Sequence, residues 1–374
     1  MVTSKLIPLF HAAYSDAMGQ AAIEVLQSGQ IASGPKVAEF EQRFAEAIGR
    51  SHVVCTNDMT SALLLALRLA SVGPGDEVLT LAYSCMSSNA PIALLGATAT
   101  WVDVDPASAS MSVQDFERAL SPRTKAVILY HVAGYPGPAA EIAALCKSRG
   151  IVLIEDCNNA LGARQHGASV GRLGDYAVFS FYPNRQINTL DGGALACPDD
   201  ATAQRARRLR RFGIDATNFR DSDGEINASS NIKEIGWSAG FNHVGAALGL
   251  VQLPLMIDRL TRTRRHAARL HDALSGLSLI RPVAVRQDCQ PAYWGFLTLA
   301  DRRDDLLVAL KRRGIHASRL HHRNDDYSGF VAQRRGLPGT DSLMSKVLAL
   351  PCGWWLDDTQ IDDVIHAIHA ECKI

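Results

Sequence analysis

Residues 126–157, AVILYHVAGYPGPAAEIAALCKSRGIVLIEDC, contain the pattern that decides the fold of this chain. Two short apolar runs, residues 126–132 and 151–157, have the length and composition of buried strands. Between them, residues 139–150 have the composition and spacing of a helix. A strand, a helix and a second strand in this order predict two neighbouring strands of a mainly parallel sheet.

The same order of elements recurs on both sides of this stretch. Residues 52–73 are predicted to form a strand, a polar turn and a helix, and residues 77–105 a strand, a helix and a strand. Residues 176–181 and 192–197 are two further short strands around a polar loop. This alternation predicts an α/β fold with helices on both faces of the sheet. In such folds ligands bind at the carboxyl ends of the strands.

The pattern changes in the last third of the chain. Residues 246–274 predict a long helix, AALGLVQLPLMIDRLTRTRRHAARLHDAL. A smaller mixed region follows, with a strand and two helices expected at residues 293–300, 304–314 and 361–372. We therefore expect residues 1–255 to form a large α/β domain with an N-terminal arm. Residues 256–374 are then a small C-terminal domain.

Composition and charge narrow the range of partners. The 374 residues include 38 Lys and Arg and 38 Asp and Glu, so no net field attracts nucleic acid or a membrane surface. No apolar run approaches the length of a membrane span. The first ten residues lack the basic start and long apolar stretch of a signal peptide. We expect a cytoplasmic protein with a small-molecule substrate and no nucleic-acid or membrane partner.

Two local features are assigned to structure instead of binding. The eight cysteines are scattered without any CxxC pair, which argues against a zinc site and a disulfide framework, and we expect no metal. The basic run at residues 205–213, RARRLRRFG, could suggest nucleic acid. Its spacing fits an amphipathic helix, and we expect Leu209 and Phe212 to face the core.

Polar residues at the ends of predicted strands are the candidates for chemistry. Asp156 ends an apolar run, and a carboxylate there can pair with a protonated pyridine nitrogen and keep the ring an electron sink. Taken alone, helix capping is the commoner use of such an aspartate. Residues 56–61 offer N–H groups and hydroxyls to a phosphate at a helix start, although capping alone explains them and is the commoner use.

Taken together, these segments resemble the DegT/DnrJ/EryC1/StrS aminotransferases, pyridoxal-phosphate (PLP) enzymes that act on keto sugars. The similarity starts at IPLF (residues 7–10) and ASGPKVAEFEQRF (residues 32–44) and ends with LALPCGWWL at residues 348–356. Between them, the matching segments include GPGDEVLTLAYS, IEDCNNALGA, FSFYPNRQINTLDGG and EIGWSAGFNHVGAALGLVQL. The resemblance implies the fold-type I PLP-transferase architecture, which is aspartate aminotransferase-like. It has a mainly parallel sheet in the large domain and a small C-terminal α+β domain.

The resemblance also implies a cofactor pocket. Asp156 matches the acid that pairs with the pyridine nitrogen, and Asn159 lies where the family usually has a glutamine or histidine near the ring. Thr60 and Ser180 match positions that hold the cofactor phosphate. The cofactor-binding positions implied in this way are Asp58, Met59, Thr60, Cys85, Asp156, Asn159, Ser180 and Ser238.

The chain departs from the family at the position of its central chemistry. Members read roughly Ser-Phe-x-Pro-Thr-Lys-Asn, whereas residues 180–186 read SFYPNRQ, so Arg185 stands at the lysine that forms the internal aldimine. An arginine side chain, with a pKa above about 12, stays protonated and cannot serve as that nucleophile or base. Lys233 is the nearest lysine by motif and is expected to face solvent. A normal transamination cycle is therefore not expected.

Further departures surround the same site. Met59 replaces the glycine before the phosphate-binding threonine and adds a side chain at that turn. Ser238 and Gly240 stand where the family usually has an asparagine, which reaches the partner subunit's phosphate, and an arginine. Cys85 lies where many members place an aromatic ring over the cofactor. Several departures together indicate natural divergence, whereas one alone could be an engineered lysine knockout.

Histidines supply titratable groups near neutral pH. The pair His321 and His322, in LHHRNDDYS, together with Tyr182, are candidate substrate contacts at a cleft between subunits. A polar surface loop is the alternative explanation for the two histidines. The candidate catalytic residues are Arg185, Asp156 and His131.

We therefore expect a divergent sugar-aminotransferase-like enzyme that acts on a sugar or sugar-like small molecule in secondary metabolism or glycan biosynthesis. It would work without an internal aldimine, with Arg185 holding a charged group. PLP or pyridoxamine phosphate (PMP) would be held non-covalently, if bound at all, and the resemblance implies a homodimer with shared active sites. The alternatives are a non-catalytic partner of an active paralogue, or a lysine-knockout form of an ordinary PLP-dependent keto-sugar aminotransferase.

Overall fold

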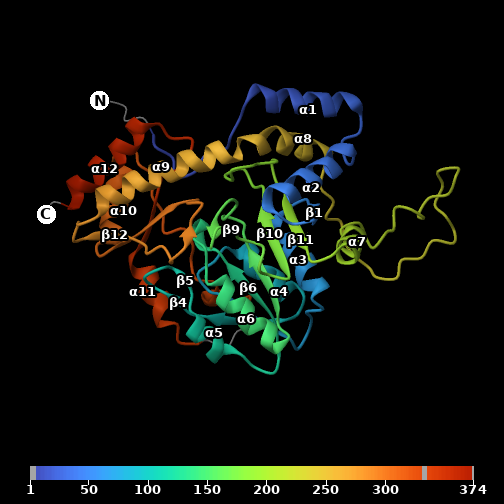
Figure 1. Cartoon of the computed structure of the whole chain (residues 1–374), viewed down its shortest axis with the longest axis horizontal. Coiled ribbons are helices and arrows are strands. Elements are labelled where there is room, and N and C mark those ends of the chain that lie inside the picture. Colours follow the sequence, from blue (N-terminus) through green and yellow to red (C-terminus); the bar gives the residue numbers. More distant parts are fainter. Residues whose placement is uncertain (1–5, 331–334, 373–374) are drawn as a thin grey trace.

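A seven-stranded sheet forms the centre of the computed structural model, which describes residues 6–330 and 335–372 (Figure 1). The strand order is β1-β11-β10-β7-β6-β2-β3. Neighbouring strands from β10 to β3 are parallel, whereas β11 is antiparallel to both β1 and β10. The mainly parallel sheet expected from the sequence is confirmed. Its strands are β1 (His52–Thr56), β2 (Glu77–Leu81), β3 (Thr98–Val102), β6 (Thr124–Tyr130), β7 (Val152–Asp156), β10 (Tyr176–Ser180) and β11 (Gly193–Cys197).

Both faces of the sheet are buried under helices. In β6, Ala126 and Ile128 pack on one face, and Val127 and Leu129 pack on the other, because successive strand side chains alternate. Helices α3 (Met59–Leu69), α4 (Met86–Leu94) and α7 (Asp200–Leu209) contribute to the first of these cores. The opposite face is covered by α2 (Pro35–Ile48), α5 (Val113–Ala119), α6 (Ala139–Arg149) and α8 (His243–Gln252). Helix α1 (Asp16–Ser28) packs on α8.

A second, antiparallel sheet follows residue 255, with the strand order β12-β14-β15. Its strands are β12 (Ile280–Pro282), β14 (Phe296–Ala300) and β15 (Val347–Leu350). Around it lie α9 (Met256–Leu274), α10 (Arg303–Arg312), α11 (Pro338–Lys346) and α12 (Asp358–Cys372). The proposed boundary at residue 255 falls at the end of the short 3-10 helix η2 (Leu253–Leu255). The division into two domains remains a prediction, since Ile7 also bridges to Ile315 in the C-terminal part.

Short elements complete the fold. Strands β4 and β5 form a hairpin, and β8 pairs with both β9 and β13, which links residues 164–169 to residues 289–290. These elements are β4 (Val104–Asp105), β5 (Ser110–Met111), β8 (Arg164–Gln165), β9 (Ala168–Ser169), β13 (Cys289–Gln290) and the 3-10 helices η1 (Val132–Gly134) and η3 (Asn324–Asp326).

The helical run His243–Leu274 joins α8, η2 and α9 and crosses the top of the view in Figure 1. By length and composition alone, it could span a membrane. Half of its most apolar window is buried inside the protein, and α8 packs against both α1 and α2. This burial explains its apolar composition as that of a core helix.

The basic run is only partly as expected. Leu209 is buried as the last residue of α7. Phe212 is exposed and has a left-handed backbone, with φ of 59°. The expectation that Phe212 faces the core is wrong, because the helix ends three residues earlier and the chain turns outward.

An aromatic cluster holds the loop that follows β10. The ring of Phe44 lies 5.3 Å from that of Phe179 and 4.9 Å from that of Phe181, both edge-on. Phe40 lies 5.2 Å from Phe181, and Phe241 packs on both. Because Phe181 begins the loop to β11, helix α2 fixes where this loop leaves the sheet.

We predict that Phe44→Ala lowers the free energy of unfolding by about 3–5 kcal/mol, because it leaves a cavity under this loop. Urea denaturation followed by circular dichroism measures the loss. The matched control is Phe212→Ala, whose ring is exposed and whose loss should stay within about 0.5 kcal/mol. Equal losses in the two variants would contradict this account of the core.

Candidate functional site

Asp156 is the last residue of β7 and lies fully buried at the carboxyl edge of the sheet, opposite Tyr130 at the end of β6. Its Oδ2 accepts a hydrogen bond of 2.6 Å from the Ser88 hydroxyl. Its Oδ1 accepts two bonds from Asn158, of 3.0 Å from the backbone N–H and 2.9 Å from Nδ2. Burial raises the pKa of this carboxyl, although those hydrogen bonds oppose the shift. A ligand that donates hydrogen bonds or carries positive charge would stabilise its ionised form.

Arg185 lies on the loop between β10 and β11, and its guanidinium is held on several sides. One Nη donates a bond of 3.2 Å to Asn158 Oδ1, and the other donates to Asn184 Oδ1. The guanidinium carbon lies 4.9 Å from the centre of the Trp294 ring, a cation–π contact. Burial lowers the pKa of Arg185 to about 10, so the group is still charged at neutral pH. Its Nε is buried with no hydrogen-bond partner among the described residues, which leaves one donor for a ligand.

Asn159, Tyr130 and His321 form a line of hydrogen bonds near this pair. Asn159 Nδ2 donates to the Tyr130 hydroxyl over 2.6 Å, and that hydroxyl lies 3.2 Å from His321 Nε2. Burial, and then the charge of Arg185, lower the pKa of His321 to about 4, so its ring is neutral at pH 7 and can accept the hydroxyl hydrogen. The Oδ1 of Asn159 is buried without a partner in the described part of the chain. It is an open acceptor for a ligand hydroxyl or amine.

The imidazole of His131 bonds to Glu155 and not to the carboxylate of Asp156. Glu155 and Asp156 are successive strand residues, so their side chains point to opposite faces of β7. The Nδ1 of His131 accepts from the Gly137 N–H over 2.9 Å, so Nε2 carries the hydrogen that bonds Glu155 at 3.1 Å. Glu155 accepts further bonds from the N–H groups of Gly171, Leu173 and Gly174. Both nitrogens of His131 are therefore occupied in supporting a turn, and its catalytic role remains a prediction.

The start of α3 carries three of the predicted cofactor positions. Asp58 is the N-cap: its Oδ1 accepts from the Ser61 N–H over 2.7 Å and its Oδ2 from the Ser61 hydroxyl over 3.0 Å. Met59 is buried, and Thr60 is half-buried. Burial, together with the charge of Asp58, raises the pKa of Asp191. Two carboxylates therefore lie at this helix start.

Cys85, Ser180 and Tyr182 lie around Arg185. Cys85 is the N-cap of α4, and both Cys85 and Tyr182 lie near the guanidinium. Ser180 is buried at the end of β10, and its hydroxyl accepts the Tyr182 N–H over 3.3 Å. The side chain of Tyr182 is exposed, so it is available to a ligand or to another protein chain.

Ser238 and Lys233 line other cavities. Ser238 lines a cavity of about 540 Å³ together with Glu41 of α2 and Arg210, the C-cap of α7. Lys233 lines another, of about 370 Å³, with Glu234 and without any residue of the site around Asp156. The cofactor role given to Ser238 is therefore a prediction that concerns a different surface of this chain.

His321 also borders an open cavity of about 470 Å³ in the C-terminal part. The lining includes His322, Ser318 and Arg319. His322 is exposed, and its Nε2 lies 3.1 Å from Asp326. The volume is in the range of small-molecule sites, and His321 is in contact with both this cavity and Tyr130.

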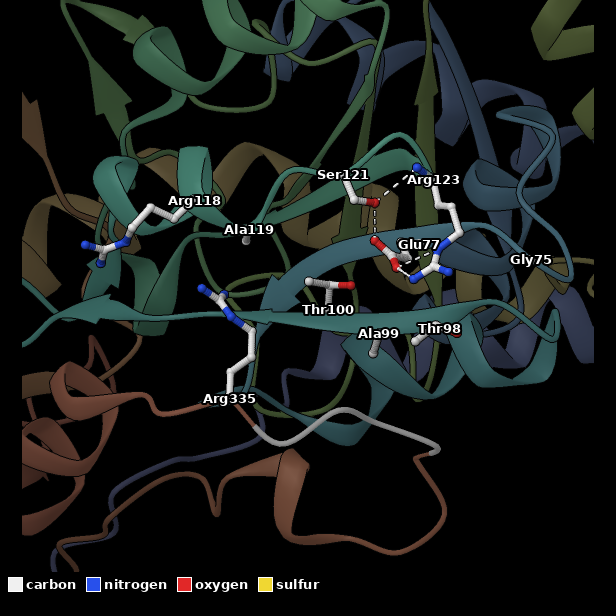
Figure 2. Close-up of a pocket in the computed structure, with 10 residues that line it drawn as sticks. All are labelled: Gly75, Glu77, Thr98, Ala99, Thr100, Arg118, Ala119, Ser121, Arg123 and Arg335. Atoms are coloured by element: carbon white, nitrogen blue, oxygen red, sulfur yellow. Dashed lines mark hydrogen bonds and ion pairs between the residues drawn. The ribbon is translucent and has the colours of Figure 1, made fainter.

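A larger cavity, of about 580 Å³, lies at the opposite end of the sheet (Figure 2). Its lining includes Glu77 and Thr98, the first residues of β2 and β3. Figure 2 shows Ser121 and Arg123 both bonded to the Glu77 carboxylate. This cavity lies at the amino ends of the strands, whereas Asp156 lies at the carboxyl end of β7, so the two sites are separate. In α/β sheets ligands bind at the carboxyl ends.

Sequence reasoning missed Ser88, Asn158 and Trp294. Asn158 stands next to the predicted Asn159, so the polar pair after the strand was the signal for it. Ser88 lies within α4, and Trp294 precedes β14, and only folding brings them to the site. Trp294 is itself fixed, because its Nε1 donates to the Asn184 carbonyl over 3.1 Å and its ring stacks on Phe10 at 4.0 Å.

The residues present fit the ring of PLP but not its phosphate. Asp156 can hold a pyridine nitrogen, and Asn159 has an open acceptor beside it. At the start of α3, however, Asp58 already takes the N–H and hydroxyl of Ser61. A phosphate dianion placed there would face a carboxylate of like charge. The pocket therefore does not fit the whole phosphorylated cofactor.

A seven-stranded sheet of this order, with its site at the carboxyl ends of the strands, defines the class: a fold-type I PLP aminotransferase fold. The chain belongs to the DegT/DnrJ/EryC1/StrS aminotransferase family, whose model matches residues 14–369. The fold and the family expected from the sequence are both confirmed. Chains of the same fold at 23% identity have been solved in a PLP form and a PMP form.

Named relatives cover almost the whole chain. A dTDP-4-dehydro-2,3,6-trideoxy-D-glucose 4-aminotransferase of Saccharopolyspora spinosa is 32% identical over 348 residues, covering 91% of this chain and 90% of the relative. The spore coat polysaccharide biosynthesis protein SpsC of Bacillus subtilis (strain 168) is 29% identical over 361 residues, covering 93% and 92%. The crystal structure of the sugar aminotransferase CalS13 from Micromonospora echinospora superimposes with a TM-score of 0.92 at 32% identity, covering 98% of this chain and 100% of that chain.

We predict that Glu155→Gln lowers the free energy of unfolding by about 3–5 kcal/mol at pH 7, because it removes a buried, fully bonded charge under the site. Burial alone would raise the pKa of Glu155, but the bonds from His131, Gly171 and Gly174 outweigh it and lower the pKa. The stabilisation is therefore present above the unfolded pKa of about 4.3 and is lost as the pH falls through the folded pKa.

Urea denaturation of wild type and Glu155→Gln between pH 3 and pH 7 checks this prediction. The matched control is Glu39→Gln, which removes an exposed carboxylate paired with Arg43 at the surface. A difference between wild type and Glu155→Gln that does not shrink with falling pH would show that the charge of Glu155 is not the stabilising feature.

Proposed function

We propose that this protein binds and converts a sugar or sugar-like small molecule in secondary metabolism or glycan biosynthesis, without a lysine-linked cofactor. Membership of the family and the names of the relatives from Saccharopolyspora and Bacillus support this substrate class. The cavity beside His321 has a suitable volume for such a ligand.

The setting of Arg185 is the observation that carries the proposal. The family resemblance assigns this position to an amine that attacks a carbonyl, whereas the guanidinium here is charged and delocalised. It is held by Asn158 and Asn184 and lies over Trp294, so its planar face and its donors have fixed directions. A group in this setting binds a carboxylate or another oxyanion and does not act as a nucleophile.

The neighbouring residues can bind and orient a ligand beside Arg185. The Asp156 carboxylate accepts hydrogen bonds from an amine or hydroxyl, and Asn159 Oδ1 provides a second acceptor. The Tyr130 hydroxyl holds its hydrogen toward His321 and accepts from Asn159. Since His321 has a pKa of about 4, it is a weak base at pH 7 and acts mainly as a fixed acceptor. Asp156 is then the stronger candidate for receiving a proton from a bound ligand.

We predict that wild type, titrated with PLP, shows no aldimine absorption band and no adduct after borohydride treatment. Arg185→Lys titrated with pyridoxal should give the band, because the new amine condenses with the aldehyde and releases water. Borohydride then reduces the carbon–nitrogen double bond to a stable secondary amine, which mass spectrometry locates on the peptide that contains residue 185.

The matched control is Arg259→Lys, because Arg259 is also a partly buried guanidinium over a tryptophan, at 4.2 Å from the Trp354 ring. This variant should form no adduct. Trapping in wild type, or no trapping in Arg185→Lys, would overturn the assignment of Arg185 to the aldimine position.

A homodimer with shared sites is the second part of the proposal. Exposed apolar side chains surround the site: Tyr182 is 52% exposed, Leu190 62% and Met86 42%. Tyr182 and Leu190 belong to the loop that carries Arg185, and Met86 directly follows Cys85. A second copy of the chain would cover this rim and complete the walls of the pocket.

We predict that the wild-type protein sediments at twice the mass of its 40.4 kDa chain and that Leu190→Asp shifts it to the monomer. Analytical ultracentrifugation over a range of concentrations measures this change. The matched control is Leu94→Asp, at the far end of α4, which should leave the dimer intact. A wild-type monomer that associates only with an active family member would favour the non-catalytic partner instead.

A further inference from the structure

A carboxylate of the protein itself occupies the start of α3. General chemistry makes a helix start at the carboxyl edge of an α/β sheet the usual seat of a phosphate, because unpaired N–H groups and the helix dipole attract negative charge. Here Asp58 places one oxygen 2.7 Å from the Ser61 N–H and the other 3.0 Å from the Ser61 hydroxyl. An internal anion therefore already uses two of the donors at this helix start.

The surroundings of Asp58 fix the backbone from which this carboxylate projects. The Thr56 hydroxyl donates to the Asp58 carbonyl over 2.7 Å. The backbone of Gly193 runs so close that a Cβ there would lie 2.5 Å from the same carbonyl oxygen. Met59, the next residue, is buried with 5% exposure and belongs to the hydrophobic cluster that also contains Val54 and Leu63.

A second carboxylate strengthens the negative charge at this position. Asp191 lies just before the Gly192–Gly193 segment that packs on Asp58, and its Oδ1 accepts the Gly192 N–H over 2.8 Å. The charge of Asp58 acts on Asp191 strongly enough to contribute to its raised pKa, after burial. The fixed cation of the site, Arg185, lies instead beside Asn158 and Trp294. The hydrogen bonds and the cation–π contact of Arg185 thus involve neither Asp58 nor Asp191.

We infer that Asp58 is a specificity-determining residue: it fills the phosphate seat at the start of α3, so the pocket selects ligands that carry no phosphate at this end. The inference rests on the proposed function, because it concerns the same pocket. A ligand that fits has a neutral or cationic group toward Asp58. Any carboxylate or other oxyanion of that ligand binds at Arg185.

Isothermal titration of the full chain with pyridoxal and with PLP tests this inference, because the two probes differ only in the phosphate. Wild type should bind pyridoxal at least as tightly as PLP. In Asp58→Asn, which retains a capping oxygen but removes the charge, the affinity for PLP relative to pyridoxal should rise about tenfold. The double variant Asp58→Ser/Met59→Gly should raise the ratio further, and added salt should reduce the difference between wild type and Asp58→Asn.

The matched control is Asp199→Asn, because Asp199 is the N-cap of α7 and accepts from the Thr202 N–H over 2.7 Å in the same manner. It should leave the ratio unchanged. Tighter binding of PLP than pyridoxal in wild type, an unchanged ratio in Asp58→Asn, or no binding of either probe to any variant would each overturn the inference. These affinities do not depend on a lysine, so failure here is distinct from failure of borohydride trapping in Arg185→Lys.

Discussion

The site depends on one side chain, Asn158, because its amide bonds to both of the charged groups that define it. Its Nδ2 donates to Asp156 and its Oδ1 accepts from Arg185. The two groups are opposite in charge, yet the amide lies between them, so each keeps hydrogen-bonding capacity for a ligand. A direct ion pair would have neutralised both and left a closed core. Asn158 thus makes a buried carboxylate and a buried guanidinium compatible with a binding pocket.

The arrangement follows from the sheet. Parallel strands end at one edge, so β6, β7 and β10 deliver Tyr130, Asp156 and Ser180 to neighbouring positions. The aromatic cluster under Phe181 then fixes the loop that carries Arg185. In this family the same frame supports sugar aminotransferases, as the structure of CalS13 illustrates. In this chain the edge carries the guanidinium of Arg185 and, at the start of α3, the carboxylate of Asp58.

These two side chains act in the same direction. The guanidinium of Arg185 cannot provide the amine that the family resemblance assigns to its position, and Asp58 opposes the phosphate that the same resemblance assigns to the start of α3. The carboxyl of Asp156 is nevertheless buried and satisfied by Ser88 and Asn158. Burying a carboxyl is costly unless it is bonded, and these two partners supply the bonds that offset this cost.

The sequence by itself determined the order of strands and helices, because hydrophobic periodicity is local, and it determined the family through ordered motifs. It also placed Asp156 at the end of a strand, and Asn159 and Arg185 in the loops that follow strands. It could not reveal the contacts of Arg185 with Trp294, or of Ser88 with Asp156, because these join residues far apart in the chain. Nor could it show that Phe212 turns outward, which depends on where α7 ends. Only the tertiary structure decided which polar groups were already satisfied and which remained open, since a buried donor or acceptor has no fixed partner until the chain is folded.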